Sequence, residues 1–498
     1  MKRRLLTIVS LILCLTCLFG CTESGTQNND TESQTQAVTD TQTDAPTEAP
    51  TETQTDAPTE SQTETQTDAP TEEPTEAPTD APTDAPTEKP TEAPTDAPTE
   101  KPTEAPTDAP TEKPTEKPTE APTEAPTEVP TEKPTEAPTE TEPPAPVPGE
   151  TPATETLTAK TYNLATENSQ LRYIGRTKPN EEGIICDHSA SGIEFQGYFT
   201  GDVVLTVASL KADTYFTVYI DGERVEERFC ATYGYDVELK MATFEDSLFH
   251  KIKILKQTEI GWSGSTLMQL DVTGYLVEAP EDRSLYFEFY GDSLTSGFGN
   301  IGLSSNDDAG YPEYQDATQT YGFLFSETAD ADCSILAMSG VGLSVGYYDN
   351  PFLDYFSKYS HLRGDEEFSF EGVRVPDIVV IHLGANDETK GDNPNNIRGY
   401  GENTGEFKNN FKEKAKELVN YIREGYNSNV IIVWAYDPWE GVPNYVEEAL
   451  GELGGEANGL FTVELKWNGI AGYTGGGNHP NVTAHETHAK ILADFLGF

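Results

Sequence analysis

The chain has 498 residues and a formal net charge of −54. Of its 35 prolines, 25 lie between residues 22 and 150, so this stretch cannot supply a packed core. Because no basic run occurs beyond the first few residues, the chain lacks the positive charge that phosphate backbones require. Nucleic acid is therefore excluded as the main partner.

Residues 1–20 are typical of an export signal. A basic start (residues 2–4) precedes an apolar stretch (residues 5–19) that is too short to span a bilayer comfortably. The run Leu-Phe-Gly-Cys at 18–21 resembles a bacterial lipobox, which implies cleavage before Cys21 and lipidation of its thiol. We therefore expect an extracellular lipoprotein, held at the cell membrane by its lipid anchor only. An ordinary secretory peptide with an incidental cysteine is the alternative.

Residues 21–156 are dominated by a four-residue repeat of the type Ala-Pro-Thr-Glu, with almost no large apolar side chain. Such a segment cannot bury enough apolar surface to offset its chain entropy. Regular prolines favour polyproline II, and acidic repulsion extends the segment further. We expect a disordered linker that spaces the folded part from the membrane.

Residues 157–281 change character and predict a β-sandwich. Asp221-Gly222 is a hairpin turn signal, and no long helical period is visible. Short runs with apolar alternation occur at 192–195, 203–207, 215–220 and 250–255.

Three cysteines remain after the signal and the lipidation site, namely Cys186, Cys230 and Cys333. An odd number without a Cys-x-x-Cys pair argues against a disulfide scaffold and against a zinc site. A Cys186–Cys230 disulfide and three free thiols both stay open.

Residues 282–498 predict an α/β domain with a parallel sheet covered by helices on both faces. One helix is marked by apolar residues at helical spacing from Phe407 to Ile422, with Gly425 as a stop. Near-continuous apolar runs predict strands at 285–289, 334–338, 378–383, 430–434 and 460–465.

Residues suited to acyl transfer follow these strands. Ser293 comes after the first strand, Gly340 after the second and Asn386 after the third, while His479 precedes an amphipathic C-terminal helix. In parallel sheets, chemistry takes place beyond the carboxyl ends of the strands. A serine nucleophile needs an imidazole base, and its oxyanion needs preorganised donors. The backbone N–H groups of Ser293 and Gly340 and the amide of Asn386 would form that oxyanion hole.

In sequence order these motifs resemble the four blocks of SGNH (GDSL) hydrolases: Gly-Asp-Ser-Leu at 291–294, Gly340, Gly-Ala-Asn-Asp at 384–387 and His-Pro at 479–480. Together with the preceding β-sandwich, residues 160–498 are similar to carbohydrate esterase family 2. The resemblance implies a jelly-roll domain joined to an SGNH domain. It also implies removal of acetyl groups from plant polysaccharides such as xylan and glucomannan. Because the sequence shows no cluster of metal-ligating residues, we expect no metal or organic cofactor.

One feature departs from the superfamily pattern. SGNH enzymes usually carry an Asp two or three residues before the histidine, where this chain has Gly477 and Gly476. The resemblance implies a tolerated Ser–His dyad, with a backbone carbonyl or another group holding the imidazole. Asp437, after the fourth strand, is an alternative partner.

Other polar residues near the motifs have structural interpretations. His485 and His488 fall in the C-terminal helix, where we expect them to face solvent or to pack. His382 lies inside an apolar strand and is expected to be a hydrogen-bonded core histidine. Asp292 and Asp387 are expected to accept hydrogen bonds from backbone N–H groups of their loops, rather than to act as a glycosidase pair.

Two aromatic positions are candidates for sugar contact. Trp439 resembles the family's tryptophan that stacks on a sugar ring, because it follows the fourth strand, whereas Trp434 lies inside that strand. Tyr348, or its neighbour Tyr347, is the second candidate.

The expected function is a lipid-anchored serine esterase that deacetylates plant-wall polysaccharide, acting as a monomer. The β-sandwich is expected to buttress the catalytic domain. An SGNH lipase or thioesterase is one alternative, and a non-catalytic glycan-binding surface protein is another.

Overall fold

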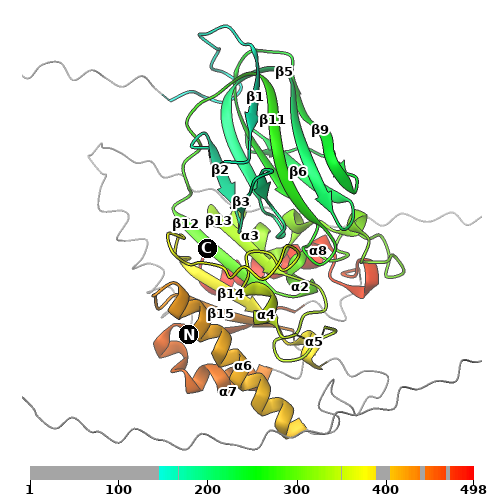
Figure 1. Ribbon diagram of the computed structural model, residues 1–498. Coiled ribbons are helices and arrows are strands. Elements are labelled where there is room, and N and C mark those ends of the chain that lie inside the picture. The colour runs from blue at the N-terminus through cyan, green and yellow to red at the C-terminus, as the bar shows by residue number, and fades with distance from the viewer. Residues whose placement is uncertain (1–144, 167, 349, 389–403, 438–442, 467–471) are drawn as a thin grey trace, which may run out of the picture. The chain divides into compact units, whose positions relative to one another are not determined.

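A computed structural model describes residues 145–498, except 167, 349, 389–403, 438–442 and 467–471 (Figure 1). The described residues belong to one compact unit. The predictions for the signal segment, Cys21, residues 21–144 of the linker and Trp439 lie outside the described residues. For residues 145–156 the predicted disordered linker is wrong, because the N–H of Gly149 donates to the carbonyl of Phe249 at 2.8 Å and Pro152 forms an antiparallel bridge with Leu248. Within the described part, no helix has the length and apolar character that crossing a bilayer would require.

Residues 159–276 are built from antiparallel strands around one apolar core, and we call them the β region (Figure 1). The long strand β5 (Gly192–Leu210) pairs with β2, β9, β10 and β11. The other strands are β1 (Ala159–Asn163), β2 (Leu171–Ile174), β3 (Lys178–Pro179), β4 (Ile184–Ile185), β6 (Thr214–Ile220), β7 (Glu223–Arg224), β8 (Phe229–Ala231), β9 (Gly234–Phe244), β10 (Phe249–Lys256) and β11 (Gly264–Leu276).

Strand β5 differs from the sequence prediction, which placed two short strands at 192–195 and 203–207. The intervening residues also pair: Gly197 lies opposite His250 of β10 and opposite Leu276 of β11. Gly197 permits this close approach, because a Cβ there would lie 2.2 Å from the carbonyl oxygen of Tyr275. One continuous strand therefore replaces the two predicted strands.

The hairpin predicted at Asp221-Gly222 is confirmed. Strand β6 ends at Ile220 and pairs with β7, which begins at Glu223. Both turn residues have positive φ, 55° for Asp221 and 93° for Gly222. This is the conformation that two-residue hairpins demand and that Asp-Gly adopts most readily.

The second part contains five parallel strands in the spatial order β13–β12–β14–β15–β16. These strands are β12 (Leu285–Gly291), β13 (Ala331–Ala337), β14 (Ile378–His382), β15 (Ile431–Tyr436) and β16 (Leu460–Glu464). All five predicted strands are present. The strand order reverses between β12 and β14, and such a reversal opens a crevice at the carboxyl ends of the strands.

Helices cover both faces of this sheet, as expected. Helices α4, α6 and α7 pack in one apolar core, and α3 and α8 pack in the other. The predicted helix is confirmed as α6, and its six expected core residues are buried. The helices are α2 (Ser293–Ser296), α3 (Tyr321–Thr328), α4 (Phe352–Phe356), α5 (Ala385–Glu388), α6 (Thr404–Gly425), α7 (Pro443–Glu452) and α8 (Val482–Leu496).

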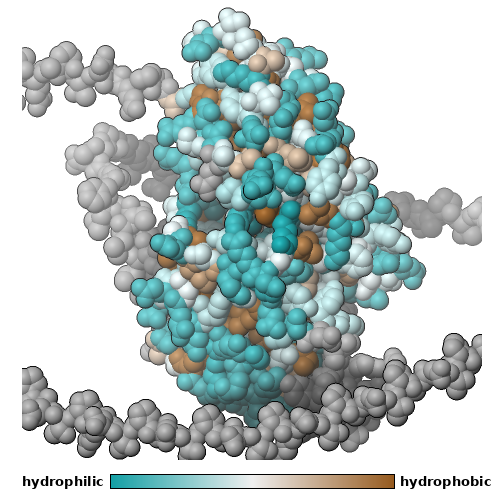
Figure 2. Space-filling view, viewed as in Figure 1, coloured by the Kyte–Doolittle hydropathy of each residue, from teal (hydrophilic) through white to brown (hydrophobic). Residues whose placement is uncertain are grey.

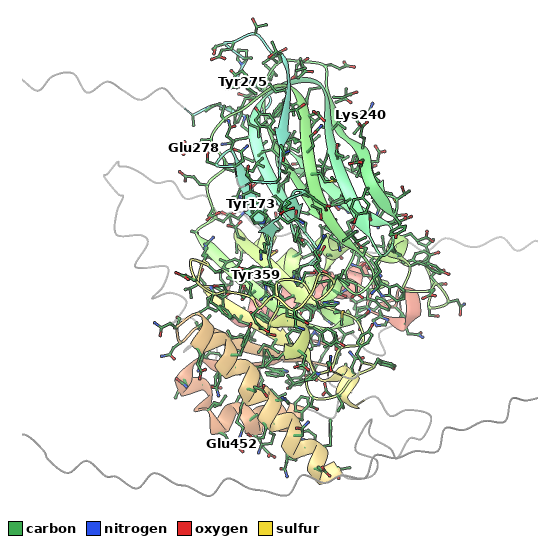
Figure 3. All side chains as sticks on the ribbon, in the orientation of Figure 1. Tyr173, Lys240, Tyr275, Glu278, Tyr359 and Glu452 are labelled. Atoms are coloured by element: carbon green, nitrogen blue, oxygen red, sulfur yellow. The ribbon has the colours of Figure 1, made fainter. Side chains whose placement is uncertain are left out.

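Polar contacts join the β region to the α/β part. Arg363 donates two hydrogen bonds to the fully buried carboxylate of Asp187, at 2.8 and 2.9 Å. The ring of His188 is within 2.8 Å of the backbone oxygen of Tyr359, a residue labelled in Figure 3. Because a buried carboxylate needs a paired charge, the Asp187–Arg363 pair fixes how the two parts meet.

Cys186, Cys230 and Cys333 are free thiols among the described residues. Of the two alternatives left open by the sequence, the structure therefore has free cysteines and no Cys186–Cys230 disulfide.

Figure 2 shows one face of the molecule, where hydrophilic side chains dominate and hydrophobic ones are scattered. Scattered apolar side chains of this kind are usual on a protein surface.

Candidate active site

Ser293 stands at the switch from strand to helix. Strand β12 ends at Gly291, and α2 begins at Ser293. The side chain of Asp292 caps this short helix by accepting a hydrogen bond of 3.0 Å from the N–H of Leu294. A side chain at Gly291 would not fit, because a Cβ there would lie 2.1 Å from Oγ1 of Thr295. The Gly-Asp-Ser motif therefore creates a tight turn that carries the serine.

The loop after β13 is held by a buried carboxylate. Asp387 accepts hydrogen bonds from the N–H groups of Leu343 (2.7 Å), Ser344 (2.7 Å) and Val345 (3.0 Å). The expectation that Asp292 and Asp387 accept from loop N–H groups is thus confirmed. Gly340, at the start of the loop, has a φ of 77°, a conformation that side-chain-bearing residues rarely adopt.

Asn386 is oriented by two contacts. Its Nδ2 donates to Oδ2 of Asp292 at 2.9 Å and to the carbonyl of Val341 at 3.1 Å. The side chain thus ties the loop after β14 to the loops after β12 and β13. Both amide hydrogens are engaged in this structure, so donation to a substrate oxyanion requires one contact, such as the longer one to Val341, to open.

His479 lies on a glycine-rich turn before α8. Its Nδ1 is 3.1 Å from the carbonyl oxygen of Gly477, and the N–H of Gly477 donates to the carbonyl of Asp307 at 2.9 Å. A backbone carbonyl thus stands where the superfamily pattern has a carboxylate. Asp437, the alternative partner, is buried and is not among the described residues that line the cavity around His479.

The predicted residues meet in one cavity of about 510 Å³. Its lining includes Ser293, Gly340, Asn386 and His479, together with both candidate tyrosines, Tyr347 and Tyr348. The further lining residues are Trp262, Leu294, Phe298, Ser339, Ala385, Gly477 and Asn478. Residues almost two hundred positions apart in the chain therefore share one site.

The sequence analysis missed a contribution from the β region. Glu259, between β10 and β11, is fully buried, and its Oε2 accepts a 2.8 Å hydrogen bond from the N–H of Ser339. The hydroxyl of Ser339 also donates to this carboxylate. Trp262, three residues further on, lines the cavity. The sequence did offer a signal for Trp262, because a tryptophan in the Gly-Trp-Ser-Gly turn lies outside the predicted strands. No sequence pattern indicated a role for Glu259.

Burial shifts the pKa values of the acidic residues and of the histidine around the site. Burial raises the pKa of Asp292 to about 7 and that of Asp387 to about 6, and hydrogen bonds only partly offset this effect. Burial also raises the pKa of Glu259. The pKa of His479 is lowered by burial and raised in part by the Gly477 carbonyl, so the imidazole is neutral and able to accept a proton at neutral pH.

Three further histidines lie deep in the fold around Tyr321. His485 and His488 are buried and pack, so solvent exposure of these residues is ruled out. His382 is a core residue, but the expected hydrogen bond was wrong: neither of its ring nitrogens has a partner among the described residues. Aromatic packing against Tyr321, with ring centroids 5.7 Å apart, surrounds it instead.

Residues 173–280 match the family described as "Carbohydrate esterase 2 N-terminal". The chain is 25% identical over 349 residues to the "Cellulase/esterase CelE" of Acetivibrio thermocellus, a match that covers 66% of this chain and 39% of that protein. It is 26% identical over 260 residues to an "Acetylxylan esterase / glucomannan deacetylase" of Cellvibrio japonicus, covering 50% of this chain and 69% of that protein.

A solved acetyl xylan esterase from the rumen bacterium Butyrivibrio proteoclasticus has a TM-score of 0.59 at 18% identity, covering 68% of this chain and 98% of that chain. The chain therefore resembles carbohydrate esterase family 2: residues 173–280 match its N-terminal model, and both curated relatives are named as esterases. The order of the motifs on the strands agrees with this likeness. Because the chain spans well under half the length of the first curated relative, that protein's activities are not transferred whole.

Proposed function

We propose that the protein is a serine esterase that removes O-acetyl groups from plant cell-wall polysaccharides such as acetylated xylan and glucomannan. The main support is that Ser293, His479 and the two other expected oxyanion donors line one cavity. The two curated relatives are named as esterases, and one of them as an acetylxylan esterase and glucomannan deacetylase.

In the proposed reaction, the Ser293 hydroxyl attacks the acetyl carbonyl while His479 takes its proton. The oxyanion accepts hydrogen bonds from the N–H groups of Ser293 and Gly340 and from the Asn386 amide, once the latter exchanges a present contact. His479 then protonates the departing sugar oxygen, which leaves an acetyl-serine. A water molecule deprotonated by His479 attacks this ester, and acetate leaves. Serine and imidazole supply the nucleophile and the base, so the proposal needs no metal or organic cofactor.

This site differs from the superfamily pattern in the group that orients the imidazole of His479. We propose that Nδ1–H of His479 donates to the Gly477 carbonyl, so that Nε2 keeps a lone pair for the serine proton. The 3.1 Å distance between Nδ1 and that oxygen supports this tautomer. A carbonyl is a weaker acceptor than a carboxylate, so the dyad gains less stabilisation of the imidazolium than a triad does.

The remaining expectations belong to the same proposal. Tyr348, and Trp439 outside the described residues, would contact the sugar. The antiparallel strands around a single core favour a β-sandwich of the jelly-roll type for the β region. Lipidation at Cys21 and the acidic repeat would display a monomeric enzyme outside the cell membrane.

The test is acetate release from acetylated xylan and acetylated glucomannan by the full-length protein. We expect Ser293→Ala to lower kcat by on the order of 10³-fold or more, with an unchanged melting temperature, because the nucleophile is removed and the fold is kept. Equal acetate release by wild type and Ser293→Ala would contradict the proposal. Faster turnover of an octanoate ester than of an acetate ester would instead favour a lipase.

A further inference from the structure

Trp262 belongs to the β region but faces the proposed catalytic site. It lies in the loop 257–263 between β10 and β11, and it lines the same cavity as Ser293 and His479. The residue is 39% exposed, so part of its large apolar surface is open to a ligand in the cavity.

The rest of the indole is packed. Gly310 passes directly beside it, since a Cβ at that position would lie 2.6 Å from Cζ2 of Trp262. The ring of Phe298 is stacked with the indole at 6.2 Å between centroids, and the same phenyl ring meets the His479 imidazole edge-on at 4.9 Å. Trp262 and His479 thus share Phe298 as a common neighbour, and all three side chains line the same cavity.

The loop that carries Trp262 is held in place from several sides. The Glu259 carbonyl accepts from the N–H groups of Trp262 (3.3 Å) and Ser263 (3.1 Å), and Oγ of Ser263 is 2.6 Å from Oγ1 of Thr258. Lys211 donates to the carbonyl of Gly261. The Glu259 carboxylate joins the loop to Ser339. These contacts hold the indole in place before any ligand binds. Binding of a ligand therefore does not have to offset the entropy of ordering this side chain.

A rigid, partly exposed aromatic face in a cavity that also presents the polar side chains of Asn386 and His479 suits a ligand that combines an apolar face with hydroxyl groups. A pyranose ring has this character, because its axial C–H bonds form an apolar face while its hydroxyls point outward. We propose that Trp262 forms one wall of a sugar subsite and packs against the pyranose that carries the acetyl ester. The inference rests on the proposed function and deepens it, because it makes the β region a direct determinant of substrate choice.

The test compares a polysaccharide with an acetate ester that has no ring. Full-length wild type, Trp262→Ala and Trp262→Phe are assayed for acetate release from acetylated xylan and from triacetin. For Trp262→Ala we expect kcat/KM on xylan to fall about 10-fold, mainly through KM, while triacetin changes less than about twofold. Trp262→Phe should recover most of the activity on xylan.

Tyr233→Ala is the matched control, because Tyr233 is an exposed aromatic residue of the β region (68%) that is not among the residues lining the cavity. We expect wild-type kinetics for this variant. An equal loss on xylan and triacetin in Trp262→Ala would overturn the inference, since it would show a general disturbance of the site. Unchanged xylan kinetics would overturn it as well.

A binding measurement separates this inference from the proposed function. Titration of an acetylated xylo-oligosaccharide into Ser293→Ala, and into Ser293→Ala/Trp262→Ala, needs no turnover. About 10-fold weaker binding in the double variant supports the subsite even if wild type releases no acetate. Equal affinities would overturn the subsite even if wild type proves to be an active esterase.

Discussion

The two sides of the proposed dyad are held in different ways. On the serine side, Ser293 is only 8% exposed and follows Asp292, whose carboxylate contacts both Leu294 and Asn386. On the histidine side, His479 is half-buried on a glycine turn, and its Nδ1 faces a backbone carbonyl. The nucleophile is therefore positioned by side chains and the imidazole by main chain. Side-chain deletions should damage the first most, and changes of backbone geometry the second.

Among the variants that leave both Ser293 and His479 in place, the largest effect is expected from Asp292→Ala. This change removes the cap of α2 and one of the two acceptors that orient Asn386, so kcat should fall by about 10²–10³-fold. Asp292→Asn separates the two contacts, because it keeps an oxygen for the Leu294 N–H but presents an amide donor to Nδ2 of Asn386. Rates of acetate release measure both variants. Equal losses in the two would show that the contact with Asn386, and not the cap of α2, is what Asp292 supplies.

A smaller effect is expected from Gly477→Ala on the histidine side. Gly477 has a φ of 57°, and an added Cβ would lie 2.9 Å from Cβ of Ala309 and 3.4 Å from Nδ1 of His479. The turn must shift, so we expect kcat/KM to fall about 10-fold. Because the Gly477 carbonyl raises the pKa of His479, weakening this contact should move the acidic limb of the pH–rate profile to lower pH.

Gly472→Ala is the matched control for that variant. Gly472 also has a positive φ, 84°, but a Cβ there would meet nothing within 4 Å. Both changes place alanine in the left-handed region, so the strain of that conformation is common to the two. If Gly472→Ala lowers the rate as much as Gly477→Ala, the carbonyl contact is not what holds the imidazole.

The smallest effect is expected on the free energy of unfolding, from the buried residue His488. Its ring packs against the ring of Tyr321, and the hydroxyl of Tyr321 lies 3.0 Å from Oγ1 of Thr295, two residues after the nucleophile. Burial lowers the pKa of His488 to about 2, well below the value of about 6.5 for an unfolded chain. The folded state therefore binds fewer protons, and the stability this histidine provides above pH 6.5 is lost as the pH falls.

His488→Phe removes this proton uptake and keeps a ring in the core. Between pH 6.5 and 4, its free energy of unfolding relative to wild type should increase by about 1 kcal/mol per pH unit. Denaturant unfolding at several pH values measures the difference. A difference between variant and wild type that does not change with pH would contradict the assignment of a neutral buried histidine.

The sequence was informative where local signals decide the structure. Near-continuous apolar runs predicted the parallel strands, and Asp221-Gly222 predicted its hairpin. The motifs around Ser293 and His479 were recognisable because each follows or precedes a regular element, and parallel strands bring such ends to one edge.

Other features depend on contacts that are distant in sequence. Strand β5 is continuous because its middle residues pair with β10 and β11, which no local pattern around Gly197 reveals. His382 could not be distinguished from a hydrogen-bonded core residue, because its surroundings come from α3 and α8. Glu259 reaches Ser339 across eighty positions, so only the folded chain shows that this carboxylate belongs to the site.

The loop 257–263 has an evolutionary consequence. It is encoded about thirty residues before the nucleophile, yet it supplies a cavity wall and the carboxylate that holds Ser339. A recombination event with a crossover between these segments would join a serine motif to a foreign loop and separate two surfaces that fit each other. The β region and the α/β part are therefore expected to be inherited as a pair, and chimaeras assembled from distant relatives should fail unless this loop travels with the nucleophile.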